Sequence, residues 1–494
     1  AEYNVAVGTT AMDAITTGDN NAALGYGALG ANTSGASNTA VGALALDACT
    51  TGTDNTAIGK SALSTSTTAA SNTAIGSAAL YANSSGANNV AIGTSAMDSN
   101  TTGANNVAVG YNSLQANTDA GGNTAIGQNA LYANSTGANN TAVGGGGTLG
   151  ANTTASYNVG VGNEALGANT EGGGNTAIGY QAMDACTTGG YNIAVGYQAM
   201  STGVTTGAGN VAVGRNALLS LTNGPGNVAV GYNALYSNTT GDIMVAIGQS
   251  ALQHATGYDG AVAVGYLAGY TLSKGRDSVS VGRAAAEKAT TAEYFVSIGG
   301  WAGGGTGTMT GDYNVSIGYY AGTDLTSGEN NIIIGKDAGR TGSPGGNVTT
   351  GSDEIYMGDE NIGVANIQVA WTAHSDKRDK TDVSPMDLGL EFINQLEPIT
   401  YRWDKRSKYS DDQSAIPDGT YKEEQLEGGF LAQDVEAIEE QYGHKLSDNT
   451  NLTFHLSGDE KMYGIKYGKF VPMLVKAVQE LSAEVEELKS KLDE

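Results

Sequence analysis

Residues 227–241 read Asn-Val-Ala-Val-Gly-Tyr-Asn-Ala-Leu-Tyr-Ser-Asn-Thr-Thr-Gly. In Val228-Ala229-Val230, two β-branched residues bracket a small one, which predicts a short strand with alternate residues on opposite faces. Gly231 permits a bend that a side chain would obstruct. Ala234-Leu235 predicts a second short apolar strand, and Asn-Thr-Thr-Gly predicts a turn. Two strands and two turns make one coil of a parallel β-solenoid.

The same phrase recurs with a period of 17 residues over about twenty rungs. Its closing glycine (the phrase glycine) stands at Gly8, Gly25, Gly42, Gly59, Gly76, Gly93, Gly110, Gly127, Gly144, Gly162, Gly179, Gly196, Gly214, Gly231, Gly248, Gly265, Gly282, Gly299, Gly318 and Gly335. Three steps are longer: Gly144–Gly162, Gly196–Gly214 and Gly299–Gly318. Their extra residues are either local bulges or protruding recognition loops. So short a period predicts rungs of one solenoid, not separate domains.

An asparagine precedes the phrase glycine by four residues in 16 of the 20 rungs. Stacked asparagines can hydrogen-bond from rung to rung, which predicts an amide ladder. A sugar- or calcium-binding array is the alternative, but the rungs lack the regular Asp that calcium repeats need. We therefore expect no metal and no cofactor. After Gly231 the pattern loosens, and Met244, Ala261, Ser278 and Phe295 replace the ladder asparagine.

The core of a single coil is thin, because each rung offers only a few small apolar side chains to offset the ordering of its backbone. Three coils side by side would share one core, so a homotrimer is expected. The rungs over residues 1–340 resemble the heads of trimeric autotransporter adhesins and, more closely, the repeat shafts of phage tail fibres. Whether the three chains wind around one another stays open.

Charge is segregated along the chain. Residues 1–373 carry 8 Lys/Arg and 23 Asp/Glu, and residues 374–494 carry 15 and 26. We expect a solenoid shaft at 1–340, a short β transition at 341–373 and a separate domain at 374–494. The net charge of −26 argues against nucleic-acid binding. No apolar run is long enough to insert into a membrane, and the first residues carry no signal-peptide pattern.

Two cysteines, Cys49 and Cys186, occupy the same position in rungs that are eight apart. At roughly 4.8 Å per rung they are too distant to form a disulfide within one chain. We interpret them as small buried thiols.

The C-terminal segment carries four motifs in a fixed order: His374-Ser375-Asp376-Lys377-Arg378-Asp379-Lys380, then Leu396-Glu397-Pro398-Ile399-Thr400-Tyr401-Arg402-Trp403, Gly429-Phe430-Leu431-Ala432-Gln433-Asp434-Val435 and Tyr463-Gly464-Ile465-Lys466-Tyr467. This succession resembles the self-cleaving intramolecular chaperone domain at the C-terminus of phage endosialidases, tail spikes and fibres. The resemblance covers residues 374–494.

The resemblance implies a catalytic dyad of Ser375 and Lys380 that cleaves the bond between His374 and Ser375. A hydroxyl needs a nearby base, and a lysine can serve where desolvation favours its neutral amine. Lys377 and Arg378 are rivals by proximity, but Arg stays protonated and cannot be the base. The only chemistry we expect is this single self-cleavage, with no external substrate.

The last helix, expected at about 468–493, carries apolar residues at alternating three- and four-residue steps, which is typical of a coiled coil. The expected trimer seam is Val471, Leu474, Val478, Leu481, Val485, Leu488 and Leu492. Val at one heptad position and Leu at the other would alone favour a dimer, whereas the shaft and the resemblance call for three chains. Packing of this helix within its own domain is the alternative.

Near-identical rungs create a register problem, because a strand paired one rung out still matches apolar to apolar. A C-terminal domain that trimerises first would align three chains. The resemblance to phage tail fibres also implies a trimeric fibre that attaches to a bacterial host surface through a glycan or an outer-surface protein. Such a fibre assembles in the host cytoplasm with other virion tail proteins and acts outside the cell.

Two other functions are considered. A bacterial cell-surface trimeric adhesin would be supported by a membrane-anchoring C-terminus, and this one predicts a helix with a polar face. A polysaccharide-degrading tail spike would need a cleft with paired carboxylates. Acidic residues such as Glu164 and Glu171 are sparse and unpatterned in the rungs, and we assign neither.

Overall fold

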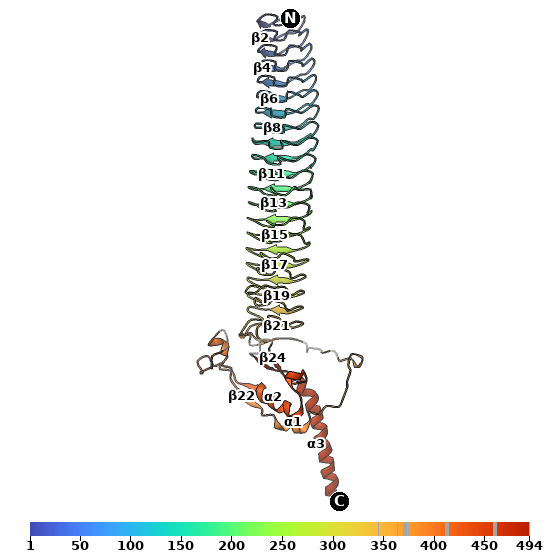
Figure 1. Ribbon diagram of the computed structural model, residues 1–494, viewed down its shortest axis with the longest axis vertical. Coiled ribbons are helices and arrows are strands. Elements are labelled where there is room, and N and C mark those ends of the chain that lie inside the picture. The colour runs from blue at the N-terminus through green and yellow to red at the C-terminus, as the bar shows by residue number, and fades with distance from the viewer. Residues whose placement is uncertain are drawn as a thin grey trace. The chain divides into compact units, whose positions relative to one another are not determined.

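The computed structural model describes residues 1–343, 345–362, 364–368, 373, 375–410, 414–457 and 462–493. It divides into two compact units, Ala1–Tyr294 and Phe295–Glu494. In the first unit each rung contributes one three-residue strand, and the coils stack one upon another (Figure 1). These strands are β1 (Val5–Val7), β2 (Ala22–Leu24), β3 (Thr39–Val41), β4 (Thr56–Ile58), β5 (Thr73–Ile75), β6 (Val90–Ile92), β7 (Val107–Val109), β8 (Thr124–Ile126), β9 (Thr141–Val143), β10 (Val159–Val161), β11 (Thr176–Ile178), β12 (Ile193–Val195), β13 (Val211–Val213), β14 (Val228–Val230), β15 (Val245–Ile247), β16 (Val262–Val264) and β17 (Val279–Val281).

Each strand pairs in parallel with the next, one rung on, as Val211 does with Val228. The middle residue points into the coil: Ala229 is fully buried. The flanking β-branched residues point outward, and Val213 and Ile247 are 36% and 40% exposed. The predicted alternation is therefore confirmed. Alanine is the inward residue because the coil is narrow, and the outer face of the strands is a row of Val, Ile and Thr side chains.

The phrase glycine meets two constraints at once. Gly231 has a φ of +138°, a region that L side chains rarely adopt. A Cβ there would lie 2.5 Å from the carbonyl oxygen of Gly248 in the next rung. The bend and the close stacking of the coils thus both require glycine at this position.

The second apolar segment is a turn and not a strand, so the prediction of two strands per rung was wrong. Asn233 and Leu235 have φ values of +56° and +50°. The left-handed conformation costs about 1–2 kcal/mol per residue, and complete burial of a leucine contributes about 1.5–3 kcal/mol. Leu235 is fully buried, so its burial offsets the conformation. Residue propensities alone do not predict that burial of the leucine outweighs the cost of its left-handed conformation.

The asparagine ladder is present, but its bonds run mainly from side chain to backbone. The side-chain oxygen of Asn106 accepts from the backbone N–H of Asn123 at 2.9 Å, and its amide donates to the carbonyl of Ala120 at 2.9 Å. Bonds between two side-chain amides occur in some rungs, as between Asn38 and Asn21 at 3.2 Å. The ladder satisfies buried backbone groups at the corner of each coil.

A second ladder follows the buried leucines, and the sequence analysis missed it. The Asn100 amide donates to Asn83 at 2.9 Å, and the Asn117 amide donates to Asn100 at 2.8 Å. Cys49 and Cys186 take the corresponding place in their rungs, and both are buried and unbridged, as expected. Burial raises the pKa of the Cys186 thiol to about 11, against a smaller lowering by a backbone hydrogen bond with Gly189.

The longer steps leave the strands in register. Thr141 pairs with Val159 across the first, Ile193 with Val211 across the second, and Val296 with Val315 across the third. The extra residues therefore lie in the turns.

The second unit begins with four parallel strands and continues into a small α+β region (Figure 1). Its parallel strands are β18 (Val296–Ile298), β19 (Val315–Ile317), β20 (Ile332–Ile334) and β21 (Ile355–Met357). Two antiparallel pairs follow: β22 (Ile399–Tyr401) with β23 (Glu427–Gly429), and β24 (Phe454–Leu456) with β25 (Tyr463–Ile465). The helices are α1 (Leu390–Gln395), α2 (Ala432–Glu439) and α3 (Phe470–Asp493), with short 3₁₀ turns η1 (Lys377–Asp379), η2 (Arg406–Lys408), η3 (Glu440–Tyr442), η4 (Leu446–Asp448) and η5 (Tyr467–Lys469).

The α+β region has a hydrophobic cluster of its own. Leu388, Phe392, Val435, Phe470 and Met473 are buried against one another. The fold class is thus confirmed as a parallel β-solenoid of about 19 turns, followed by a small α+β region that ends in a helix. Within the described residues, no helix combines the length and the apolar character needed to cross a membrane.

Candidate functional site

Ser375 and Lys380 lie at either end of a single 3₁₀ turn. Asp376 caps η1 by accepting the backbone N–H of Arg378 at 2.9 Å, and the Lys380 N–H donates to the carbonyl of Lys377 at 3.3 Å. This turn brings the two side chains together, and the Lys380 ammonium donates to the Ser375 hydroxyl oxygen at 2.5 Å. The structure therefore places the predicted nucleophile and base in direct contact.

The rival Arg378 is held elsewhere. Its guanidinium pairs with the Asp376 carboxylate at 2.5 Å. These hydrogen bonds lower the pKa of Asp376 and raise that of Arg378. Within this turn, Arg378 therefore pairs with the Asp376 carboxylate, whereas Lys380 donates to the Ser375 hydroxyl.

Ser375 and Lys380 are both exposed. The desolvation that would favour a neutral lysine amine is not supplied by the packing of the described residues of one chain. His374, the other residue of the predicted scissile bond, lies outside the described residues.

Two faces of helix α3 differ in their burial. Phe470, Met473 and Ala477 are buried, and the first two belong to the hydrophobic cluster of the α+β region. The residues of the predicted seam point away from that cluster, and their exposure runs from 40% at Val485 to 84% at Leu492. Packing within the domain therefore accounts for one face of the helix and leaves the coiled-coil positions exposed.

Two glutamates of this region were missed in the sequence analysis. Glu480 of α3 accepts the backbone N–H of Leu390 at 2.6 Å and pairs with Lys476 at 3.0 Å, which lowers the pKa of Glu480. Glu439 is fully buried and accepts the Thr453 backbone N–H at 3.1 Å. No local sequence pattern identifies them, because Glu480 and its partner Leu390 are 90 residues apart, and Glu439 and its partner Thr453 are 14 residues apart.

One acidic residue of the rungs is not isolated. Gln181 donates to the Glu164 carboxylate at 2.7 Å. Burial, and after it the negative charge of Glu164, raise the pKa of Asp184. This pair of carboxylates lies on two neighbouring rungs, and we assign it no catalytic role.

Residues 375–444 match the family model described as the chaperone of endosialidase. The match starts at Ser375, the residue that contacts Lys380. No curated protein matches the chain. No solved structure matches it either. The protein therefore combines a β-solenoid with a C-terminal chaperone domain of the endosialidase type.

Proposed function

We propose that this protein is the trimeric shaft of a phage tail fibre that attaches to a bacterial host surface. In this proposal the C-terminal domain aligns three chains and then releases itself by cleavage between His374 and Ser375. The observation that carries the proposal is the hydrogen bond from Lys380 to Ser375 at the first residue of the chaperone match.

Two exposed apolar surfaces support a trimer. One is the seam of α3, where Val478 and Leu481 are 61% and 48% exposed. The other is the outer face of the strands, where Ile58, Ile126 and Ile178 are each about 40% exposed. Apolar rows this long and regular usually mark interaction surfaces. Both would be covered by the same partners, two further copies of the chain.

The dyad can cleave the chain without an external substrate. The Ser375 oxygen attacks the carbonyl carbon of His374, and a neutral Lys380 amine takes the hydroxyl proton. The peptide C–N bond breaks as the Ser375 nitrogen gains a proton, which leaves an ester between residue 374 and the Ser375 oxygen. Water then hydrolyses this ester to a carboxylate at residue 374 and the free hydroxyl of Ser375.

The Lys380 amine is exposed in one chain. We infer that the cleavage step follows assembly, since two neighbouring copies would remove water from the amine that one chain leaves exposed. Trimerisation would therefore switch on the base, and cleavage would then remove the alignment domain. The shaft would persist because it unfolds slowly.

Intact-mass measurement after expression tests the cleavage. The wild type is expected to give a fragment ending at residue 374, and Ser375→Ala and Lys380→Gln only the full-length chain. Lys377→Gln is the matched control, because it removes a neighbouring lysine of the same turn and should still cleave. Cleavage of Ser375→Ala at the wild-type rate would rule out the mechanism.

A further inference from the structure

The second unit contains a polar pocket of about 340 Å³, lined by Asp324, Asp337, Arg340, Thr341, Gly342, Ser343 and Glu360. It is formed by the turns that follow strands β19, β20 and β21. Its volume lies at the lower end of the range of small-ligand pockets. It is thus large enough for one or two sugar rings.

The polar groups of the pocket are held in place by their neighbours. Asp337 pairs with Arg340 at 2.7 Å and with Lys336 at 3.0 Å. Thr306 donates to the Asp324 carboxylate at 2.5 Å. Each carboxylate keeps further lone pairs, because an ionised carboxylate has about four acceptor sites. The pocket therefore presents fixed acceptors that suit the adjacent hydroxyls of a sugar.

An aromatic stack supports the arginine of the pocket. The Arg340 guanidinium lies 4.8 Å from the centre of the Tyr320 ring, and Tyr320 stacks on Trp301 at 5.2 Å with an interplanar angle of 11°. Three carboxylates and one guanidinium line the pocket. This excess of negative charge disfavours phosphates, sialic acids and other anions, and it favours neutral or amino sugars.

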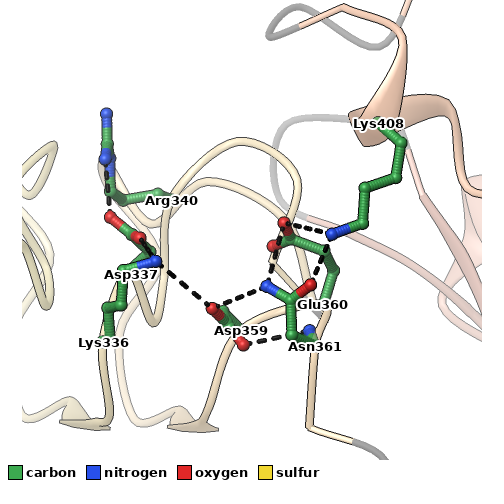
Figure 2. A network of polar contacts seen from close by, with 7 residues as sticks. All are labelled: Lys336, Asp337, Arg340, Asp359, Glu360, Asn361 and Lys408. Atoms are coloured by element: carbon green, nitrogen blue, oxygen red, sulfur yellow. Dashed lines mark hydrogen bonds and ion pairs between the residues drawn. The ribbon is translucent and has the colours of Figure 1, made fainter.

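Lys408 of the chaperone domain contacts Glu360, one of the residues that line the pocket (Figure 2). Lys408 lies 3.8 Å from the Glu360 carboxylate and donates to the side-chain oxygen of Asn361. Lys405 donates to the backbone carbonyl of Glu360. Both lysines lie within the segment that matches the chaperone model. Departure of that domain would remove Lys408 from the Glu360 carboxylate.

We propose that this pocket binds a neutral or amino hexose of a surface glycan. We further propose that the ion pair of Lys408 with Glu360 hinders this binding until the chaperone domain leaves. The second half of the proposal rests on the cleavage proposed above, whereas the first half does not. The pocket lies in residues 324–360, which precede the scissile bond and stay with the shaft.

Saturation-transfer NMR with galactose, galactosamine and N-acetylneuraminic acid at millimolar concentration tests the ligand class. We expect transfer to the ring protons of galactose or galactosamine in the cleaved wild type. Asp324→Asn and Glu360→Gln should each weaken this binding about tenfold or more, since each removes a charged hydrogen-bond acceptor. Glu329→Gln is the control, because it makes the same change of charge at an exposed residue outside the pocket.

Several results would overturn the proposal. No transfer to galactose or galactosamine, equal transfer in Asp324→Asn, or preference for N-acetylneuraminic acid would reject the sugar site. Unchanged thermal unfolding of each variant establishes that a loss of transfer reflects the pocket.

The uncleaved Ser375→Ala protein separates the two proposals. It should bind the sugar several-fold more weakly than the cleaved wild type. Equal binding by both forms would reject the role of Lys408. If the wild type binds the sugar but is never cleaved, the proposed self-cleavage is rejected and the proposed sugar site is retained.

Discussion

The rungs of Ala1–Tyr294 and the α+β region of residues 375–493 are stabilised in opposite ways. In the rungs, each residue repeats the contacts of its equivalent one turn earlier, as Asn123 repeats those of Asn106. In the α+β region, single contacts join distant segments, such as Glu480 with Leu390. Repeated contacts give strength but leave the register ambiguous, whereas unique contacts specify one arrangement. Under the proposed function, this difference explains why a repetitive shaft would benefit from a non-repetitive domain.

The largest expected effect comes from removing the unique region. Deletion of residues 374–494 should abolish folded trimers, because nothing then aligns three chains of near-identical rungs. Size-exclusion chromatography with light scattering would measure the oligomer. Thermostable trimers from the shortened chain would show that the rungs align themselves.

A smaller effect is expected from one substitution in the repeated region. Gly231→Ala should lower the thermal unfolding temperature, because its Cβ would lie 2.5 Å from the Gly248 oxygen and its φ is strained. A cost of about 1–3 kcal/mol for the backbone conformation alone is expected. Gly145→Ala is the matched control, since a Cβ there meets nothing within 4 Å. Equal stability of the two variants would contradict the stacking argument.

The smallest effect concerns a buried thiol of the second ladder. The pKa of Cys186 is raised to about 11 in the folded chain, against about 8.5 for an unfolded thiol. Its contribution to stability is therefore complete below pH 8.5 and is lost as the pH rises toward 11, by up to about 1.4 kcal/mol per pH unit.

Chemical unfolding of the wild type and of Cys186→Ala between pH 8 and 10 would measure this difference. The stability gap should narrow with rising pH, and a thiol reagent should leave the folded wild type unmodified at pH 8. A gap that widens with pH would contradict the burial of a neutral thiol.

The two regions also differ in how far the sequence predicts them. The strands and the glycine bends can be predicted from local residue types, because every rung repeats the same residue types at the same positions. The conformation of Leu235 does not, since burial overrides its backbone preference. The contact of Ser375 with Lys380 was expected from the resemblance, and the 3₁₀ turn explains it. The exposure of that pair and the pocket beside Glu360 depend on distant segments, which no local pattern encodes.

The preserved pairing of Thr141 with Val159 across an 18-residue step has a consequence for how such chains change over generations. Because turns absorb the additional residue, recombination between misaligned repeats needs no strict spacing. A gene could gain or lose whole rungs, and the product would lengthen or shorten in increments of about 4.8 Å. Length is then a trait that can vary while every neighbouring contact keeps its form.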